Sequence, residues 1–198
     1  MRNQSAFPAD KRMQQGAWLF LLTLAIFFVS SILLYGIYAY LRRDETWAQQ
    51  RLPSMFLTST ICLLAISGMV HWATRCVRRQ LLRRTAWLMG GSAFAATAFL
   101  AMQTKSMAEM VMVAQDDASV SRGLFGMVVV LGILHALHVL GGVIALFVVA
   151  VRTAFGHYDH ERHFGIDFSA QYWHFLDIVW LCMIATFWVT TGGFDLPF

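Results

Sequence analysis

The sequence predicts an all-α integral membrane protein in which five transmembrane helices form one bundle. Of the 198 residues, 58% are apolar and 13% are charged, whereas soluble domains contain about 45–50% apolar and 25% charged residues. The charges also occur in clusters, with long apolar intervals between them. Each interval holds at least about 20 residues, which is enough helix to cross a hydrocarbon layer roughly 30 Å thick. We expect residues 1–198 to form a single domain.

The five apolar intervals can be followed in order along the chain. They run from Arg12 to Arg42, from Arg51 to Arg75, from Arg84 to Lys105, from Arg122 to Arg152 and from Asp167 to Asp195, the last interrupted by Asp177. In hydrocarbon the backbone satisfies its own N–H and C=O groups, and spans this long do so as helices rather than as the roughly ten-residue strands of a barrel. The expected helices lie near residues 16–41, 53–74, 85–104, 123–151 and 169–190. The first is interpreted as an uncleaved signal anchor.

The basic residues predict the orientation of the bundle. With five spans, the membrane face that receives the N-terminus carries twice as many Lys and Arg residues as the opposite face. This bias places the N-terminus in the cytoplasm and the C-terminus outside, as expected for a multi-pass protein of the inner (cytoplasmic) membrane. Because these cations sit just beyond helix ends, the net charge of +4 indicates contact with anionic lipid rather than with nucleic acid. Cys62, Cys76 and Cys182 form no CxxC pair and are expected to be free thiols.

Function has to be sought in the few polar residues inside the spans, because such residues are costly in hydrocarbon. Asp177 lies about ten residues into the last helix, where an acid costs about 2.5–3.5 kcal/mol. It should therefore face protein, and His174, one turn earlier, is a candidate hydrogen-bond partner. Trp173, Asp177 and Trp180 share one helix face by their spacing. A contact between helices or subunits is the main interpretation, and a proton-relay role is the alternative.

His135 and His138 lie one turn apart on the fourth expected helix. Two imidazoles on one side of a helix cannot reach a haem iron from opposite faces, so a structural hydrogen-bonding role is favoured over ligation. Pairing of either histidine with His174 in a metal site stays open. Gly132 and Ala136 form a small-xxx-small pair that permits close approach of another helix.

The loop that follows this helix combines Arg152 with three histidines at a spacing of three, His157, His160 and His163. A solvated loop, a phospholipid phosphate site and a metal site are all compatible with this composition. The chain contains no GxSxG, Walker, HExxH or Gly-rich dinucleotide motif. A chain with intramembrane polar contacts and no catalytic motif is typical of a subunit of a larger complex.

The last two spans resemble subunit III of the haem-copper respiratory oxidases, the cytochrome c oxidases and quinol oxidases. The residues that carry the resemblance are His135-Ala136-Leu137-His138-Val139, Arg152, His157, His163-Phe164-Gly165, Asp167 and Tyr172-Trp173-His174-Phe175-Leu176-Asp177-Ile178-Val179-Trp180. The earlier spans fit more loosely, through Trp18-Leu19-Phe20-Leu21-Leu22 and Leu52-Pro53. Five spans are similar to the shorter bacterial form of this subunit.

The resemblance implies a non-catalytic subunit of a terminal oxidase that takes electrons from cytochrome c or quinol. Haem and copper would lie in the partner subunits I and II, with a small subunit IV as an optional further partner. The chain itself would hold no redox cofactor but would bind phospholipid, with Arg152 and His157 matching positions near a lipid head group. Such a subunit supports proton uptake and protects subunit I during turnover. One departure is that residues 16–41 lack the carboxylate that many members carry in the equivalent helix.

Three other functions remain open on the sequence. An accessory subunit of a nitric oxide reductase could use the same motifs. A haem-binding membrane anchor could use His135, His138 and His174. A small transporter is disfavoured, because the two halves of the chain carry no paired broken helices.

Overall fold

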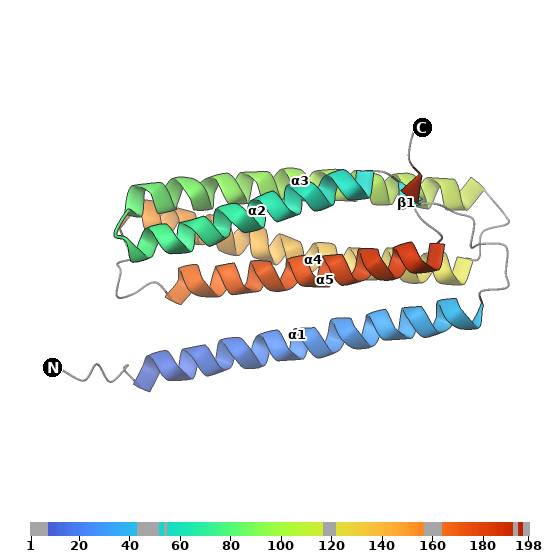
Figure 1. Cartoon of the computed structure of the whole chain (residues 1–198), viewed down its shortest axis with the longest axis horizontal. Helices are drawn as coiled ribbons and strands as arrows, with labels where there is room; N and C mark the ends of the chain where they lie inside the picture. Colours follow the sequence, from blue (N-terminus) through green and yellow to red (C-terminus); the bar gives the residue numbers. More distant parts are fainter. Residues whose placement is uncertain are drawn as a thin grey trace.

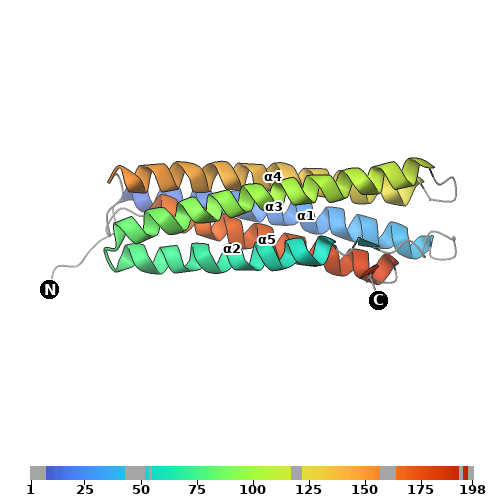
Figure 2. The same cartoon turned by 90° about the horizontal axis from the view of Figure 1, so that it is seen from above.

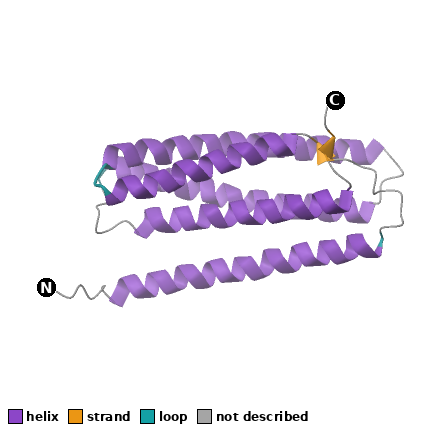
Figure 3. Cartoon of the chain, viewed as in Figure 1, coloured by secondary structure: helices purple, strands orange, loops and turns teal. Residues whose placement is uncertain are grey.

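The computed structural model describes residues 8–42, 52–53, 55–116, 122–156, 164–191 and 194–195, and these are almost entirely helical (Figure 3). Five long helices run side by side, in alternating directions (Figures 1 and 2). They are α1 (Pro8–Leu41), α2 (Met55–Arg78), α3 (Leu82–Asp116), α4 (Arg122–Ala154) and α5 (Phe164–Thr191). Two short strands, β1 (Leu52–Pro53) and β2 (Phe194–Asp195), pair in parallel near the end of α5.

All five helices are long and apolar enough to cross a membrane, which confirms the predicted fold class. The spans are Arg12–Leu41, Phe56–Arg78, Leu82–Glu109, Gly126–Ala154 and Phe164–Thr190. The outer surface of the bundle is correspondingly apolar; for example, Phe94 on α3 is 80% exposed and Leu19 on α1 is 63% exposed. Such side chains are compatible with lipid, which is as apolar as they are.

The helices extend beyond the predicted apolar intervals. Helix α1 begins at Pro8 rather than near residue 16, and α3 continues to Asp116 rather than ending near residue 104. Helix α5 begins at Phe164, five residues before the predicted start. A helix can continue into the polar zone outside the hydrocarbon, where water satisfies charged side chains, so the apolar interval marks the span and not the helix end.

Two helix ends are closed by residues in the left-handed conformation. At the end of α2, Gln80 has a φ of 61°, the Leu81 N–H donates to the Cys76 carbonyl at 3.0 Å, and the Gln80 N–H donates to the Val77 carbonyl at 3.0 Å. This is a Schellman cap, which turns the chain directly into the antiparallel α3. After α4, Gly156 takes the same role with a φ of 72°, a conformation that glycine adopts without steric cost.

Small residues bring α4 close to its two main neighbours. A Cβ added to Gly132 would overlap the side chain of Met107 on α3, so the predicted small-residue pair does face another helix. A Cβ added to Gly142 would lie 3.2 Å from Leu176 and 3.3 Å from the Trp173 ring on α5. Glycine at these positions therefore permits the close approach on which van der Waals attraction between membrane helices depends.

Helix α1 lies at the edge of the bundle, where it contacts α4 and α5 (Figure 1). Phe28 is fully buried against these helices, and the Tyr35 hydroxyl hydrogen-bonds to the Thr190 hydroxyl at 2.8 Å. Most of the remaining α1 surface is exposed. The helix is thus attached by one narrow stripe of side chains.

One end of the bundle, here called the basic end, gathers most of the described arginines. Helices α1, α3 and α5 begin there, and α2 and α4 end there (Figures 1 and 2). The arginines at or beside these helix ends are Arg12, Arg75, Arg78, Arg79, Arg83, Arg84 and Arg152. The grouping agrees with the charge bias on which the predicted orientation rests.

Candidate functional site

Polar side chains of α2 and α5 face one another along the seam between these two helices. At the basic end, Arg78 Nη2 donates to Asp167 Oδ1 at 3.5 Å. Deeper in the membrane, Ser67 Oγ and His174 Nδ1 share a hydrogen bond of 2.7 Å. The rings of His71 and His174 lie 6.2 Å apart between centroids. The seam therefore combines an ion pair with a strong hydrogen bond, interactions that are favoured where water is scarce.

Trp180 closes the seam at its deep end and is 1% exposed. Its Nε1–H donates to Thr60 Oγ1 on α2 at 3.1 Å. Its ring packs against Phe56 at 5.9 Å and edge-on against Phe99 at 6.1 Å. On the α4 side, the His135 imidazole stacks on the same indole at 5.4 Å with an interplanar angle of 26°. Trp180 thus contacts side chains of α2, α3 and α4 at once.

The two histidines of α4 occupy different environments. His135 is 1% exposed between Trp180 and Phe28, and neither ring nitrogen has a hydrogen-bond partner among the described residues. His138 is partly exposed, and its Nδ1–H donates to the Leu134 carbonyl one turn earlier at 2.7 Å. A hydrogen-bonding role therefore fits His138, whereas the contacts of His135 are aromatic. The carbonyl of His138 also accepts a hydrogen bond from the Tyr172 hydroxyl of α5 at 3.0 Å.

Asp177 is buried, at 5% exposed, and faces the interior as its position in the helix predicts. The expected hydrogen bond to His174 is not formed: Asp177 Oδ2 lies 3.8 Å from His174 Nδ1, beyond hydrogen-bond range. His174 bonds instead to Ser67, because α2 brings that hydroxyl closer than the next turn of α5 brings the carboxylate. Neither Asp177 oxygen has a hydrogen-bond partner in the described part of the chain, and the same is true of the buried Trp173 Nε1.

The histidines do not assemble into a metal site. His174 contacts α2 rather than His135 or His138, so the pairing left open by the sequence does not occur in the structure. Across the six described ranges, no group of three or more His, Cys, Asp or Glu side chains is placed to hold a metal ion. The contacts instead attach α5 to α2 and α4.

The α2 partners in the seam were not identified from the sequence. Thr60, Ser67, His71 and Arg78 are single polar residues in an apolar helix, and each alone suggests nothing. Their spacing of seven, four and seven residues nevertheless places them in one stripe on the α2 surface. That periodicity was the available signal, and it predicts a polar neighbour such as the Trp173 to Trp180 segment.

Of the two residues expected to bind lipid, Arg152 lies exposed in the last turn of α4, at the basic end. There its charge is favourably placed at the negative end of the helix dipole. His157 lies outside the described residues, as do His160 and His163.

Comparisons with known proteins agree on one family. Residues 3–191 match the family model described as cytochrome c oxidase subunit III. The chain is 31% identical over 140 residues to cytochrome c oxidase subunit 3 of Pylaiella littoralis, which covers 70% of this chain and 48% of that protein. It is 29% identical over 132 residues to the subunit of Marchantia polymorpha, covering 66% and 48% of the two chains. With the subunit of Papio hamadryas the identity is 28% over 134 residues, covering 67% and 49%.

The chain spans about half the length of these curated relatives. The family match, in contrast, includes all five membrane spans and every polar contact of the α2 and α5 seam. The chain therefore belongs to the cytochrome c oxidase subunit III family.

Proposed function

We propose that this chain is the non-redox subunit III of a proton-translocating haem-copper terminal oxidase in aerobic electron transport. The observation that carries the proposal is the family match over residues 3–191. In this proposal residues 1–198 form one domain in the cytoplasmic membrane, with the basic end at the cytoplasmic face. The partners are oxidase subunits I and II, with a small subunit IV as an optional third.

The proposal assigns the haem and copper chemistry to the partner subunits. The buried polar residues of this chain have contacts that suit packing: His135 stacks on Trp180, His138 bonds within its own helix and His174 bonds to Ser67. Each of these contacts fixes a helix relative to a neighbour or to its own preceding turn. The subunit would then support proton uptake and turnover stability by holding the membrane part of subunit I in place.

Purification on a tag attached to this chain, in mild detergent, tests the proposal. We expect oxidase subunits I and II to co-purify with the chain in equal amounts, together with haem and oxygen-reducing activity. An unrelated tagged five-helix protein from the same membranes serves as the control. Recovery of a nitric oxide reductase pair instead of an oxidase, or of the chain alone, would overturn the assignment.

Phospholipid binding at Arg152 and His157 is a second part of the proposal. Arg152 is exposed at the basic end, where a guanidinium can form charge-assisted hydrogen bonds with a lipid phosphate. Replacing both residues with alanine is expected to lower the amount of phospholipid that co-purifies while haem content stays unchanged. Lipid analysis and haem quantification on the same sample check this, and an unchanged lipid content in the double variant would rule the site out.

A further inference from the structure

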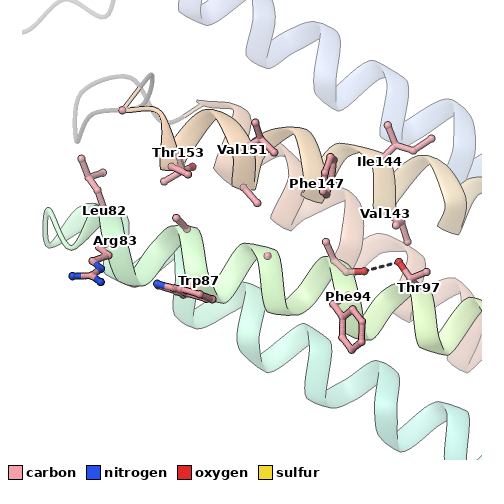
Figure 4. Close-up of a pocket in the computed structure, with 16 residues that line it drawn as sticks. Leu82, Arg83, Trp87, Phe94, Thr97, Val143, Ile144, Phe147, Val151 and Thr153 are labelled. Atoms are coloured by element: carbon pink, nitrogen blue, oxygen red, sulfur yellow. Dashed lines mark hydrogen bonds between the residues drawn. The ribbon is translucent and has the colours of Figure 1, made fainter.

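A deep groove lies between α3 and α4 on the outer surface of the bundle, away from the α2 and α5 seam. Its volume is about 940 Å³, within the roughly 300–1,000 Å³ that is usual for ligand sites. One wall is formed by α3 residues from Leu82 to Thr97, and the other by α4 residues from Val143 to the turn at Gly156. Figure 4 shows the labelled side chains of both helices along it.

The lining of the groove is apolar over most of its length. Phe94 and Phe147 are 80% and 61% exposed and present ring surface along the groove. The two threonine hydroxyls that line it are already satisfied, because Thr97 donates to the Ala93 carbonyl at 2.9 Å and Thr153 to the Val149 carbonyl at 2.7 Å. The deep part of the groove therefore offers an occupant van der Waals contact and no free hydroxyl donor.

The mouth of the groove is cationic. Arg83 lines it at the basic end, one residue into the α3 span, and lies beside Leu82 and Trp87 in Figure 4. The ion pairs among the described residues involve Arg78, Lys105 and His174, and none of them involves Arg83. Trp87 is exposed next to it, as is common for tryptophan at the level of lipid head groups.

The dimensions of the groove match one leaflet of a bilayer. From Arg83 to Thr97 the α3 wall rises by roughly 20 Å at 1.5 Å per residue, which exceeds the roughly 15 Å of hydrocarbon in half of a 30 Å core. An occupant with an anionic head at Arg83 and a tail reaching Thr97 would therefore have the length of a phospholipid acyl chain.

We infer that this groove is a binding site for one anionic phospholipid, whose phosphate pairs with Arg83 and whose acyl chain lies between α3 and α4. Bulk lipid is as apolar as the groove, so burial of the tail gives little selectivity. The charge-assisted hydrogen bonds of a guanidinium with a phosphate supply it. The site is separate from the proposed Arg152 and His157 site, since neither of those residues lines the groove. It also goes beyond the oxidase assignment, which does not depend on it.

The chain offers matched variants that test the groove from both ends. Arg83→Gln removes the cation at the mouth, and Arg84→Gln makes the same charge change at the next residue, which does not line the groove. Gly90 lines the groove, and a Cβ added there meets no atom within 4 Å. Gly90→Leu therefore fills the groove without displacing protein. Gly68→Leu is its control on α2, because Gly68 is equally open and does not line the groove.

The experiment reconstitutes the purified chain, with whatever companions it retains, in phosphatidylcholine vesicles that contain a minor fraction of phosphatidylglycerol. After re-extraction, native mass spectrometry counts the bound phosphatidylglycerol. We expect Arg83→Gln and Gly90→Leu each to lose one phosphatidylglycerol per chain relative to Arg84→Gln and Gly68→Leu. Circular dichroism confirms that all four variants keep their helix content.

Three results would overturn the inference. Equal phosphatidylglycerol in Gly90→Leu and Gly68→Leu would mean that the groove holds no lipid. Equal loss in the two arginine variants would mean that Arg83 has no specific role. Loss of a companion protein from Gly90→Leu with lipid unchanged would mean that a partner helix occupies the groove. The identity of the companions in the unmodified chain tests the oxidase proposal separately, so the two can fail independently.

Discussion

Truncation of Trp180 to alanine is expected to destabilise the bundle by about 3–5 kcal/mol, the usual effect of removing a buried tryptophan. The indole is 1% exposed and contacts Phe56, Phe99 and His135, so its loss leaves a cavity between helices. Helix association in a membrane depends on such packing rather than on exclusion of water. The hydrogen bond to Thr60 is lost as well.

Two further variants separate packing from other effects of the Trp180 substitution. Trp180→Phe keeps much of the ring contact and loses the hydrogen bond, so a smaller destabilisation is expected, with about 0.5–1.5 kcal/mol from the bond itself. Trp188 lies two turns later on α5 and is 53% exposed. Its replacement by alanine is expected to change stability by no more than about 0.5 kcal/mol. Unfolding in mixed micelles, followed by circular dichroism, measures all three. Equal destabilisation by the two alanine variants would contradict the packing account.

Substitution of Asp177 is expected to separate structure from proton transfer. Asp177→Asn keeps the shape of the side chain and some hydrogen-bonding capacity, so assembly and oxygen consumption should stay close to those of the unmodified complex. Asp177→Leu removes the acceptor beside His174, and a buried donor left without an acceptor costs about 1–3 kcal/mol. Leucine should therefore loosen the subunit from its complex more than asparagine does, with turnover falling only in proportion to the subunit lost.

Retention of the subunit and oxygen consumption are measured on the same preparations of both Asp177 variants. The exposed Gln171, on the same helix, provides a control through Gln171→Leu. A fully assembled but slow Asp177→Asn complex would show that the carboxylate takes part in proton transfer, and the structural role would then be wrong.

The sequence was sufficient to predict the number and type of the helices, because span length and charge position are set by the thickness of the bilayer. The interior position of Asp177 followed in the same way, from the cost of exposing an acid to lipid. The helix ends were predicted less well. Helix α1 begins at Pro8 and α3 reaches Asp116, since water outside the hydrocarbon removes the constraint that made the spans visible.

Contacts between helices could not be predicted from one helix at a time. The His174 to Asp177 bond was expected because both residues lie on α5, yet Ser67 of α2 is closer to the His174 ring. The stacking of His135 on Trp180 depends likewise on how α4 packs against α5. These partners are set by tertiary packing, which the periodicity of a single helix does not encode.

The central claim is that this chain is a subunit of a haem-copper oxidase and holds no redox centre itself. The most direct test takes the complex purified on this chain, releases the chain with a stronger detergent, and measures haem and copper in the two fractions. The account predicts that haem, copper and oxygen-reducing activity all remain with subunits I and II, and that the released chain shows no Soret band. A released chain that carries stoichiometric haem would contradict it.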